Sequence, residues 1–426
     1  MLAVGIDWAH KKHTVVLQKE LGKIAVTLTI DDTLDGYFRL LDAIRDYGNN
    51  PQPADVLFAI ERRDLRLVDF LLANGFSGFL LNPNRLPGFR ARYKSSGATD
   101  DNHEAFILAD LLWLDRNQLS PLSPESERIR RLRMLLADRD SFVHDSTSLI
   151  NRLRTYLHEY YPATLELFSD IGSKTALAFV ETYPSLAATK PVCVRARTGR
   201  EVDRDTLKQF LVRQHSFTRK RLVHMLNVLT QKPIPVPKEI IETRQKTVLR
   251  VIQQLKPVQA AIAAYEREIV ELTKGDPETE RFGTLPGAGP IIRSSLYTLF
   301  GDDRTRFRSA AEVQSYAGTV PRTIQSGEYR AIGFRFACNR DYRAVTTLWA
   351  LSCMRQADWA RRYYNRKRAE GKGHYQALRC LANILLRIAF AMWQNRTTFS
   401  EDQYLAQMAR HQMRNQSKSE PNQREA

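Results

Sequence analysis

Two long stretches of this 426-residue chain carry apolar residues at every seventh position. The first stretch covers residues 129–157 and the second covers residues 241–269. A seven-residue apolar repeat keeps one face of an α-helix against a partner over many turns. The repeats therefore predict two long, coiled-coil-like helices, which pack on each other or on a second subunit. The repeated residues are Ile129, Leu136, Val143, Ile150 and Leu157, then Ile241, Val248, Leu255, Ile262 and Ile269.

A proline lies within the second repeat. Pro257 has no backbone N–H, and its ring clashes with the preceding helical turn, so we expect it to kink or break that helix. Each stripe by itself is also typical of the core of an ordinary helical bundle.

The region before the first repeat has the pattern of an α/β domain. Short β-branched or apolar runs predict strands, and apolar residues at helical spacing predict the helices between them. Three consecutive strands followed by alternating helices and strands is the order of an RNase H-like sheet, although other α/β folds share parts of it. The expected strands are residues 2–8, 13–18, 23–30, 54–61 and 76–81, and the expected helices are residues 35–47 and 65–74.

Two acidic residues mark the ends of these strands. Asp7 follows an apolar strand, and Glu61 closes the fourth strand. Burial of a lone carboxylate is costly, so an acid in this position usually has an ion or a base as its partner. The first and fourth strands of an RNase H-like sheet are neighbours, so these two acids are expected to meet.

A third acidic group follows in residues 99–105. If a helix begins there, Asp101 and Glu104 are three residues apart and share one face. Carboxylates that converge repel one another, and divalent cations relieve that repulsion. Two hard cations such as Mg²⁺ (or Mn²⁺) on shared carboxylates activate an attacking oxygen and stabilise a leaving one. We therefore assign Asp7, Glu61, Asp101 and Glu104 as candidate metal ligands and catalytic residues.

Structural roles are also open for each acid. Asp7 alone fits a capping or salt-bridged acid, and Glu61 fits an ion pair with a neighbouring arginine. Asp100 or Asp101 fits a helix N-cap, with Glu104 completing a capping box.

The C-terminal part begins near residue 281 with a glycine-rich turn. Gly287 and Gly289 precede a helical run, and such a turn presents backbone N–H groups to a phosphate. This arrangement is similar to the hairpin of helix-hairpin-helix DNA binders, which hold the DNA backbone without reading sequence. A bare turn between two helices looks the same.

A serine lies among arginines further along. Ser326 precedes Gly327, a pair that is common in loops, but four arginines lie within a short stretch around it. Guanidinium groups suit phosphate, and they could hold a scissile phosphate while a hydroxyl attacks it. Ser326 is therefore a candidate nucleophile, and the candidate nucleic-acid-binding side chains are Arg322, Arg330, Arg335 and Arg343.

Composition indicates the class of partner. The formal net charge is +17, which favours a polyanion such as nucleic acid. Four scattered cysteines give no zinc pattern, and the apolar run over residues 382–393 is too short to span a membrane. We expect a cytoplasmic, nucleoid-associated protein of a bacterium or archaeon, with no membrane partner.

These motifs resemble those of one transposase family. Gly5-Ile-Asp7-Trp8-Ala9, the strand ending in Glu61, and Asp101-Asn-His-Glu104-Ala105 resemble the N-terminal DEDD domain of the IS110 group of insertion-sequence transposases. That domain is similar to RuvC Holliday-junction resolvases. The family usually has Asp where this chain has Glu104, which leaves Asp100 as a rival fourth acid. Residues 284–393 resemble the family's C-terminal domain, whose serine nucleophile corresponds to Ser326.

The resemblance implies a fold and an activity. It implies a RuvC-like DEDD catalytic domain (residues 1–120), a helical, coiled-coil-like region (121–280), a mainly α serine transposase domain (281–396) and a polar, partly disordered tail (397–426). It also implies recombination of donor and target DNA, guided by a structured RNA from the element, by a dimer or tetramer. The alternatives are a RuvC-like endonuclease for branched DNA, which needs no Ser326, and a nucleic-acid-binding protein without catalysis.

Overall fold

The computed structural model describes residues 1–62, 66–81, 89, 100–122, 125–185, 193–196, 199–202, 204–230, 235–326 and 329–419. The chain divides into two units. The first unit combines Met1–Leu132 with Thr273–Ala426, and the second unit is Arg133–Leu272. The long helices α5 and α10 each pass from one unit into the other.

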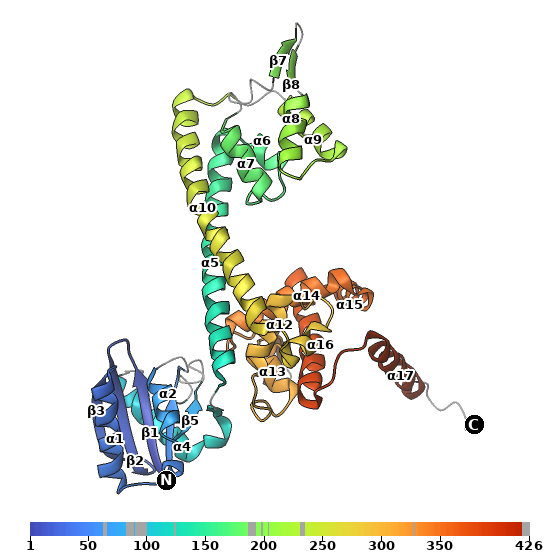
Figure 1. Cartoon of the computed structure of the whole chain (residues 1–426). Coiled ribbons are helices and arrows are strands. Elements are labelled where there is room, and N and C mark those ends of the chain that lie inside the picture. The colour runs from blue at the N-terminus through green and yellow to red at the C-terminus, as the bar shows by residue number, and fades with distance from the viewer. Residues whose placement is uncertain are drawn as a thin grey trace, which may run out of the picture. The chain divides into compact units, whose positions relative to one another are not determined.

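The N-terminal part of the first unit contains a six-stranded mixed sheet (Figure 1). Its strand order is β3-β2-β1-β4-β5-β6, so the first and fourth strands are neighbours, as predicted. The β1–β4 and β4–β5 pairs are parallel, and the other pairs are antiparallel. The strands are β1 (Leu2–Trp8), β2 (Lys12–Glu20), β3 (Lys23–Asp31), β4 (Val56–Ile60), β5 (Ser77–Leu80) and β6 (Ser120–Leu122). The first five of these strands were predicted from the sequence, and the short β6 was not.

Helices cover both faces of this sheet. On one face, α1 (Leu34–Gly48) and α2 (Arg66–Ala73) pack on side chains of β1 and β4 that include Val4, Ile6 and Phe58. On the other face, α4 (Asp101–Leu114) packs on the alternate side chains of the same strands. Short 3-10 helices at η1 (Pro53–Asp55) and η3 (Arg116–Gln118) precede β4 and β6. This arrangement is compatible with an RNase H-like domain.

A polar cluster lies at the junction between β3 and α1. Asp32 accepts hydrogen bonds from the Tyr37 hydroxyl and from Arg66 Nη2, the latter at 2.6 Å, and His13 Nε2 lies 3.2 Å from Asp32 Oδ1. Burial raises the pKa of the Asp32 carboxyl, but the hydrogen bonds from Tyr37, Arg66 and His13 outweigh it and hold that pKa at about 2. The cluster therefore favours the ionised form of Asp32.

The second unit is built on the two predicted long helices, α5 (Glu127–Tyr160) and α10 (Lys238–Thr273). They run side by side in opposite directions, since Arg139 pairs with Glu266 at 2.7 Å while Glu159 pairs with Arg244. The rings of Phe142 and Tyr265 meet between these ion pairs, 5.6 Å apart. The two apolar repeats thus pack on each other within one chain.

Pro257 lies inside α10 without ending it. A break at Pro257 is therefore excluded, and the kink, which was the other expectation, stays a prediction. A 36-residue helix with buried residues on both sides of Pro257, including Val251, Leu255 and Ile269, has enough packing to offset one missing N–H and the ring clash.

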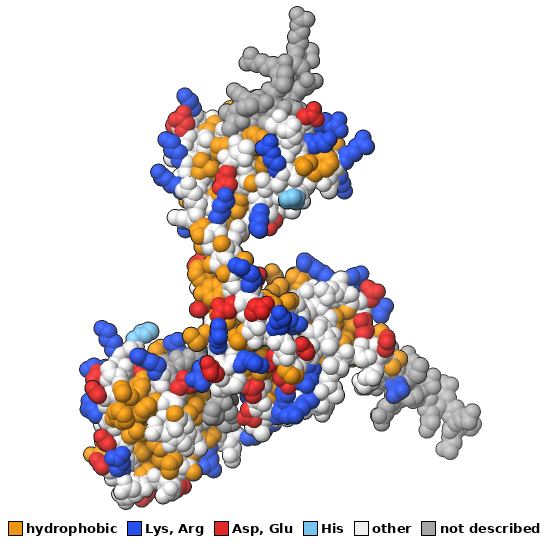
Figure 2. Space-filling model, in the orientation of Figure 1, with side chains coloured by type: hydrophobic (Ala, Val, Ile, Leu, Met, Phe, Trp, Pro, Cys, Tyr) orange, Lys and Arg blue, Asp and Glu red, His pale blue; other side chains and the backbone are white. Residues whose placement is uncertain are grey.

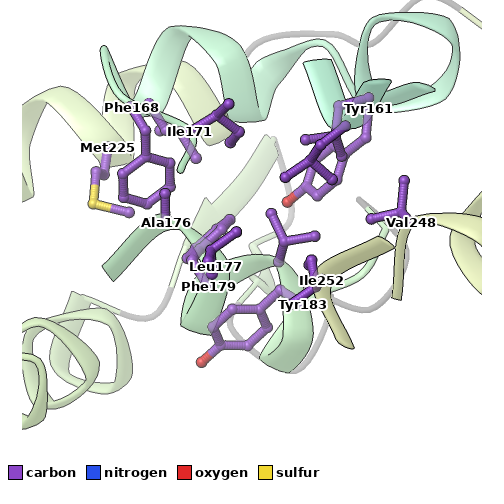
Figure 3. Packing of buried hydrophobic residues seen from close by; sticks show 14 of the residues in the cluster. Tyr161, Phe168, Ile171, Ala176, Leu177, Phe179, Tyr183, Met225, Val248 and Ile252 are labelled. Carbon is purple, nitrogen blue, oxygen red and sulfur yellow. The ribbon is translucent and has the colours of Figure 1, made fainter. Parts of the chain in front are cut away.

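Four shorter helices complete the core of the second unit: α6 (Ala163–Leu167), α7 (Lys174–Thr182), α8 (Arg204–Arg213) and α9 (Arg219–Leu229). Figure 3 shows how Phe168, Phe179 and Met225 pack together with residues of α5 and α10. A small hairpin of β7 (Cys193–Ala196) and β8 (Gly199–Val202) precedes α8. The hairpin, α8 and α9, which lie between residues 189 and 237, were not predicted from the sequence.

The C-terminal part of the first unit is mainly helical. A buried aromatic core holds it together, with Phe300 between Phe282 and Trp393 at ring distances of 5.4 and 5.3 Å. The helices are α11 (Pro277–Gly283), α12 (Pro290–Phe300), α13 (Ala310–Tyr316), α14 (Arg340–Gln356), α15 (Asp358–Ala369), α16 (His374–Asn395) and α17 (Glu401–Ser419). Helix α17 lies in the segment expected to be a polar tail. A hairpin of β9 (Arg322–Ser326) and β10 (Tyr329–Gly333) lies between α13 and α14.

Candidate functional site

The two strand-end acids are neighbours in the sheet. The parallel register of β1 and β4 pairs Ile6 with Ile60, so Asp7 and Glu61 are the next residues on the two strands. Neighbouring strands lie about 4.8 Å apart, and residues in register on them point to the same face. The predicted neighbouring of the first and fourth strands is therefore confirmed, while the meeting of the Asp7 and Glu61 side chains stays a prediction.

A close contact identifies the face to which these acids point. An added Cβ at Gly5 would lie 1.9 Å from the Ala105 carbonyl oxygen and 2.4 Å from the Ala109 nitrogen, so the backbone of α4 lies directly on β1. Side chains two apart along a strand share a face. Asp7 is two residues after Gly5 and so points to the α4 face.

The direction of α4 brings its first turn to the same end of the strands. Asp110, near the end of α4, accepts a hydrogen bond from the Gly22 N–H at 3.0 Å. Gly22 follows β2 and lies beside the beginning of β1, because β2 runs antiparallel to β1. Helix α4 therefore runs opposite to β1 and begins near the end of β1. Its first turn carries Asp101 and Glu104.

Asp100, the rival fourth acid, is the N-cap of α4. Its Oδ1 accepts a hydrogen bond from the His103 N–H at 2.7 Å. This is the capping role left open by the sequence. Glu104 stands one residue too late to complete a capping box, because the third helical position is His103. Because Asp100 has this capping role, Glu104 is the better candidate for the fourth acid of the site.

Within the described ranges, no three His, Cys, Asp or Glu side chains lie close enough together to hold a metal ion. The carboxylates at this end of the sheet are nevertheless of the chemical type that binds divalent cations. Four carboxylates supply the hard oxygen ligands that Mg²⁺ and Mn²⁺ prefer. Asp7, Glu61 and Glu104 are partly buried, while Asp101 is exposed.

The candidate nucleophile lies on a different element, the β9–β10 hairpin. Ser326 is the last residue of β9 and is exposed, and it pairs with Tyr329 across the hairpin. Gly327, its neighbour in the motif, lies outside the described residues. Arg322 shares the exposed face of β9 with Ser326, because both lie at alternate positions from Ile324.

The candidate arginines occupy both ends of this hairpin. The backbone of Arg330 lies in β10, but its side chain lies outside the described part of the chain. Arg335 and Arg343 are at the base, beyond Gly333, whereas Ser326 is at the tip. Arg343 Nη2 donates a hydrogen bond to the Arg335 carbonyl oxygen at 2.5 Å.

The two glycines before α12 differ in what their backbone offers. Gly287 has a positive φ of 75°, and its N–H donates to Gln356 Oε1 at 2.8 Å, so this N–H is already satisfied inside the domain. Gly289 is the N-cap of α12, has no side-chain cap, and has open space where a Cβ would be. Gly289 therefore fits the predicted backbone-phosphate contact better than Gly287.

The hairpin itself is what the sequence analysis missed. Residues 322–326 and 329–333 read as two five-residue runs around a two-residue Gly-Glu connection, which is a recognised hairpin signal. The sequence indicated only a loop serine among arginines, and it gave no signal that Arg343 and Arg379 both contact the Phe334 ring.

Comparisons with known proteins agree with this arrangement. A family model described as a transposase, the DEDD domain of IS110, matches residues 4–162, and a second one described as transposase IS116/IS110/IS902 family matches residues 279–365. A protein assigned as the mini-circle transposase for IS117 in Streptomyces coelicolor is 28% identical over 94% of this chain and 96% of its own length. The protein of insertion element IS116 from Streptomyces clavuligerus is 26% identical over 93% of this chain and 96% of its own.

A fold with an acid-bearing sheet and a separate serine hairpin, matched in both parts by transposase families, defines a transposase, an enzyme that cleaves and rejoins DNA. The chain belongs to the IS110 group of insertion-sequence transposases. A DEDD transposase domain uses divalent metal ions in general, and a transposase binds DNA as its substrate.

One helix among the described residues, α16 (His374–Asn395), is long and apolar enough to cross a membrane by length and composition. Half of its most apolar window is buried inside the fold, and Leu381, Leu385 and Trp393 belong to the core. This is the pattern of a core helix.

Proposed function

We propose that this transposase is a recombinase that uses a carboxylate cluster and a serine for one strand exchange. Asp7, Glu61, Asp101 and Glu104 hold Mg²⁺ or Mn²⁺, and Ser326 is the nucleophile. The observation that carries this proposal is the register of β1 and β4, which makes Asp7 and Glu61 neighbours on the face covered by α4.

The chemistry at Ser326 is a balanced phosphoryl transfer. Ser326 Oγ forms a bond to phosphorus as the bond to one strand oxygen breaks, and that oxygen leaves with the proton that Ser326 gives up. The phosphoserine ester keeps the energy of the broken bond, so a hydroxyl of the second strand can displace Ser326 without ATP. A bound divalent ion supplies charge stabilisation for the phosphate oxygens.

The basic groups position the nucleic acid in this proposal. Arg322 lies on the Ser326 face at the base of the hairpin and contacts phosphates further along the bound strand, while Gly289 offers the uncapped N-terminus of α12 to the DNA backbone. Lys and Arg side chains are spread over the visible face of the molecule rather than gathered in one patch (Figure 2). With the formal charge of +17, this spread supports a protein that holds donor DNA, target DNA and a structured guide RNA.

Recombination of two duplexes needs four strand cuts, so we propose that the active form is a dimer or tetramer. We also propose that the protein works in the cytoplasm at the nucleoid. Sequencing of the RNA that co-purifies with the chain tests the guide, and light scattering of the purified complex tests the assembly.

The test of the proposal is a covalent trap. Labelled donor DNA is incubated with the protein and RNA transcribed from the element's flanking non-coding DNA, then denatured to reveal a protein–DNA adduct. We expect an adduct with wild type, none with Ser326→Ala, and none after chelation until Mg²⁺ is restored. Thr323→Ala, a hydroxyl on the opposite face of the same hairpin, is the matched control and keeps the adduct.

A RuvC-like endonuclease is the second candidate, favoured by the partly buried Asp7–Glu61 pair alone. It predicts free cut ends without any adduct, unchanged by Ser326→Ala. That result would replace the recombinase proposal.

A further inference from the structure

Two arginines contact one phenylalanine at the base of the β9–β10 hairpin. The guanidinium carbon of Arg343 lies 4.4 Å from the centre of the Phe334 ring, and that of Arg379, from α16, lies 4.7 Å from it. Arg335 is adjacent in the chain, and its carbonyl oxygen accepts a hydrogen bond from Arg343. We call Phe334, Arg335, Arg343 and Arg379 the arginine cluster.

The positive charge of this cluster has no acidic partner among the residues that the structure describes. Among the described residues, none of the three arginines forms an ion pair with Asp or Glu, and the buried Nε atoms of Arg335 and Arg343 have no hydrogen-bond partner. Burial, and the neighbouring charge of Arg343, lower the pKa of the Arg379 guanidinium. Positive charges held close together cost free energy, and so do buried N–H donors without an acceptor. A bound anion would relieve both costs.

The surroundings of Arg343 are closely packed. Gly318 has a φ of 65°, and an added Cβ there would lie 2.8 Å from Arg343 Nε and 2.6 Å from Cys338 Sγ. The chain thus keeps a side chain out of this position, and Arg343 lies against backbone. Arg343 is therefore held in place by its surroundings rather than being a loose surface charge.

We propose that the arginine cluster binds a backbone phosphate of the nucleic acid, with Arg379 as a third guanidinium beside Arg335 and Arg343. The exposed ring of Phe336 favours nucleic acid over a free anion as the ligand. Phe336 is 74% exposed and packs on Phe334 at 4.9 Å, and aromatic rings beside arginines bind the bases and phosphates of a strand.

The site differs from the one expected for the scissile phosphate. Ser326 is at the tip of the hairpin, and Arg322, which pairs with Gly333, is at its base. The four residue steps between them span about 13 Å at the usual strand rise. The arginine cluster therefore holds a phosphate some distance from the cut and acts as a positioning site. This inference rests on the proposed function only in taking a nucleic acid as the ligand.

The experiment compares Arg379→Gln with wild type in two measurements that need no catalysis. The first is the salt dependence of binding to a short DNA duplex of arbitrary sequence. Loss of one phosphate contact lowers the slope of log affinity against log salt by about 0.9 on duplex DNA, or about 0.7 on a single strand. Arg379→Lys keeps the charge and is expected to keep the slope. Arg45→Gln, an exposed arginine already paired with Asp42, is the charge-matched control and keeps the slope.

The second measurement asks whether an anion site exists without nucleic acid. Sulfate, compared with chloride at equal ionic strength, is expected to raise the Tm of wild type and Arg45→Gln more than that of Arg379→Gln. Equal Tm shifts in all three proteins would overturn the site. A sulfate effect that depends on Arg379, with an unchanged slope on both duplex and single-stranded DNA, would overturn the nucleic-acid assignment. Because neither readout involves strand cutting, both outcomes are independent of the roles proposed for Asp7 and Ser326.

Discussion

The contact between α4 and Gly5 gives a sharp prediction for Gly5→Ala. A Cβ at Gly5 would lie 1.9 Å from the Ala105 carbonyl oxygen, and the contacting atoms belong to backbone that no side-chain rotation can move. Ordinary contact begins near 3.4 Å. Helix α4 must therefore move by roughly 1.5 Å, and overpacking of this kind typically costs about 1–3 kcal/mol.

The same displacement reaches the candidate site. Asp101 and Glu104 lie in the first turn of α4, and a misplacement of about 1 Å can lower a rate by about 10²-fold. We expect Gly5→Ala to lower the free energy of unfolding in urea by the amount above and to lower recombination by about two orders of magnitude.

A second strand glycine provides the control for stability. At Gly333 the nearest atom to an added Cβ is the Arg322 carbonyl oxygen at 3.9 Å, so Gly333→Ala should change the unfolding midpoint little. If Gly5→Ala unfolded and recombined like wild type, the close packing of α4 on β1 would be refuted.

Three other substitutions test separate parts of the fold. The pKa of Asp32 is held at about 2, below its ordinary value, so its contribution to stability is present above pH 4 and is lost as the pH falls toward 2. Asp32→Asn should remove this loss of stability in acid, which amounts to at most about 2 kcal/mol. The free energy of unfolding, measured as a function of pH, checks this. Asp110→Ala removes the acceptor of the Gly22 N–H, and urea unfolding should show a loss of about 1–3 kcal/mol. Pro257→Ala restores a helical N–H at an exposed position, and calorimetry should show a more stable second unit, by up to about 3 kcal/mol.

Much of the fold could be predicted because local patterns and packing agree. The apolar run ending at Asp7, the β-branched runs of β2 and β3, and the two heptad stripes each have the period of the element that they form. The pairing of β1 with β4, which brings Asp7 beside Glu61, needed the additional rule that RNase H-like sheets place these strands together.

Other features depend on contacts between distant residues, which a single sequence does not display. Arg379 meets Phe334 only because α16 packs near the base of the β9–β10 hairpin. Asp100 and Asp101 look alike in sequence, and only the start of α4 separates the N-cap from the first turn. Helix α10 continues through Pro257 instead of breaking there, because tertiary packing overrides local propensity.

The central claim is that one enzyme needs both the carboxylates and Ser326. The most direct measurement is recombination between a donor and a target plasmid in cells that carry the protein and the element's flanking non-coding DNA. Wild type and Asp35→Asn, an exposed acid in α1, should give product, whereas Asp7→Asn and Ser326→Ala should give none. Product that survives Ser326→Ala, or product that survives Asp7→Asn, would contradict the claim.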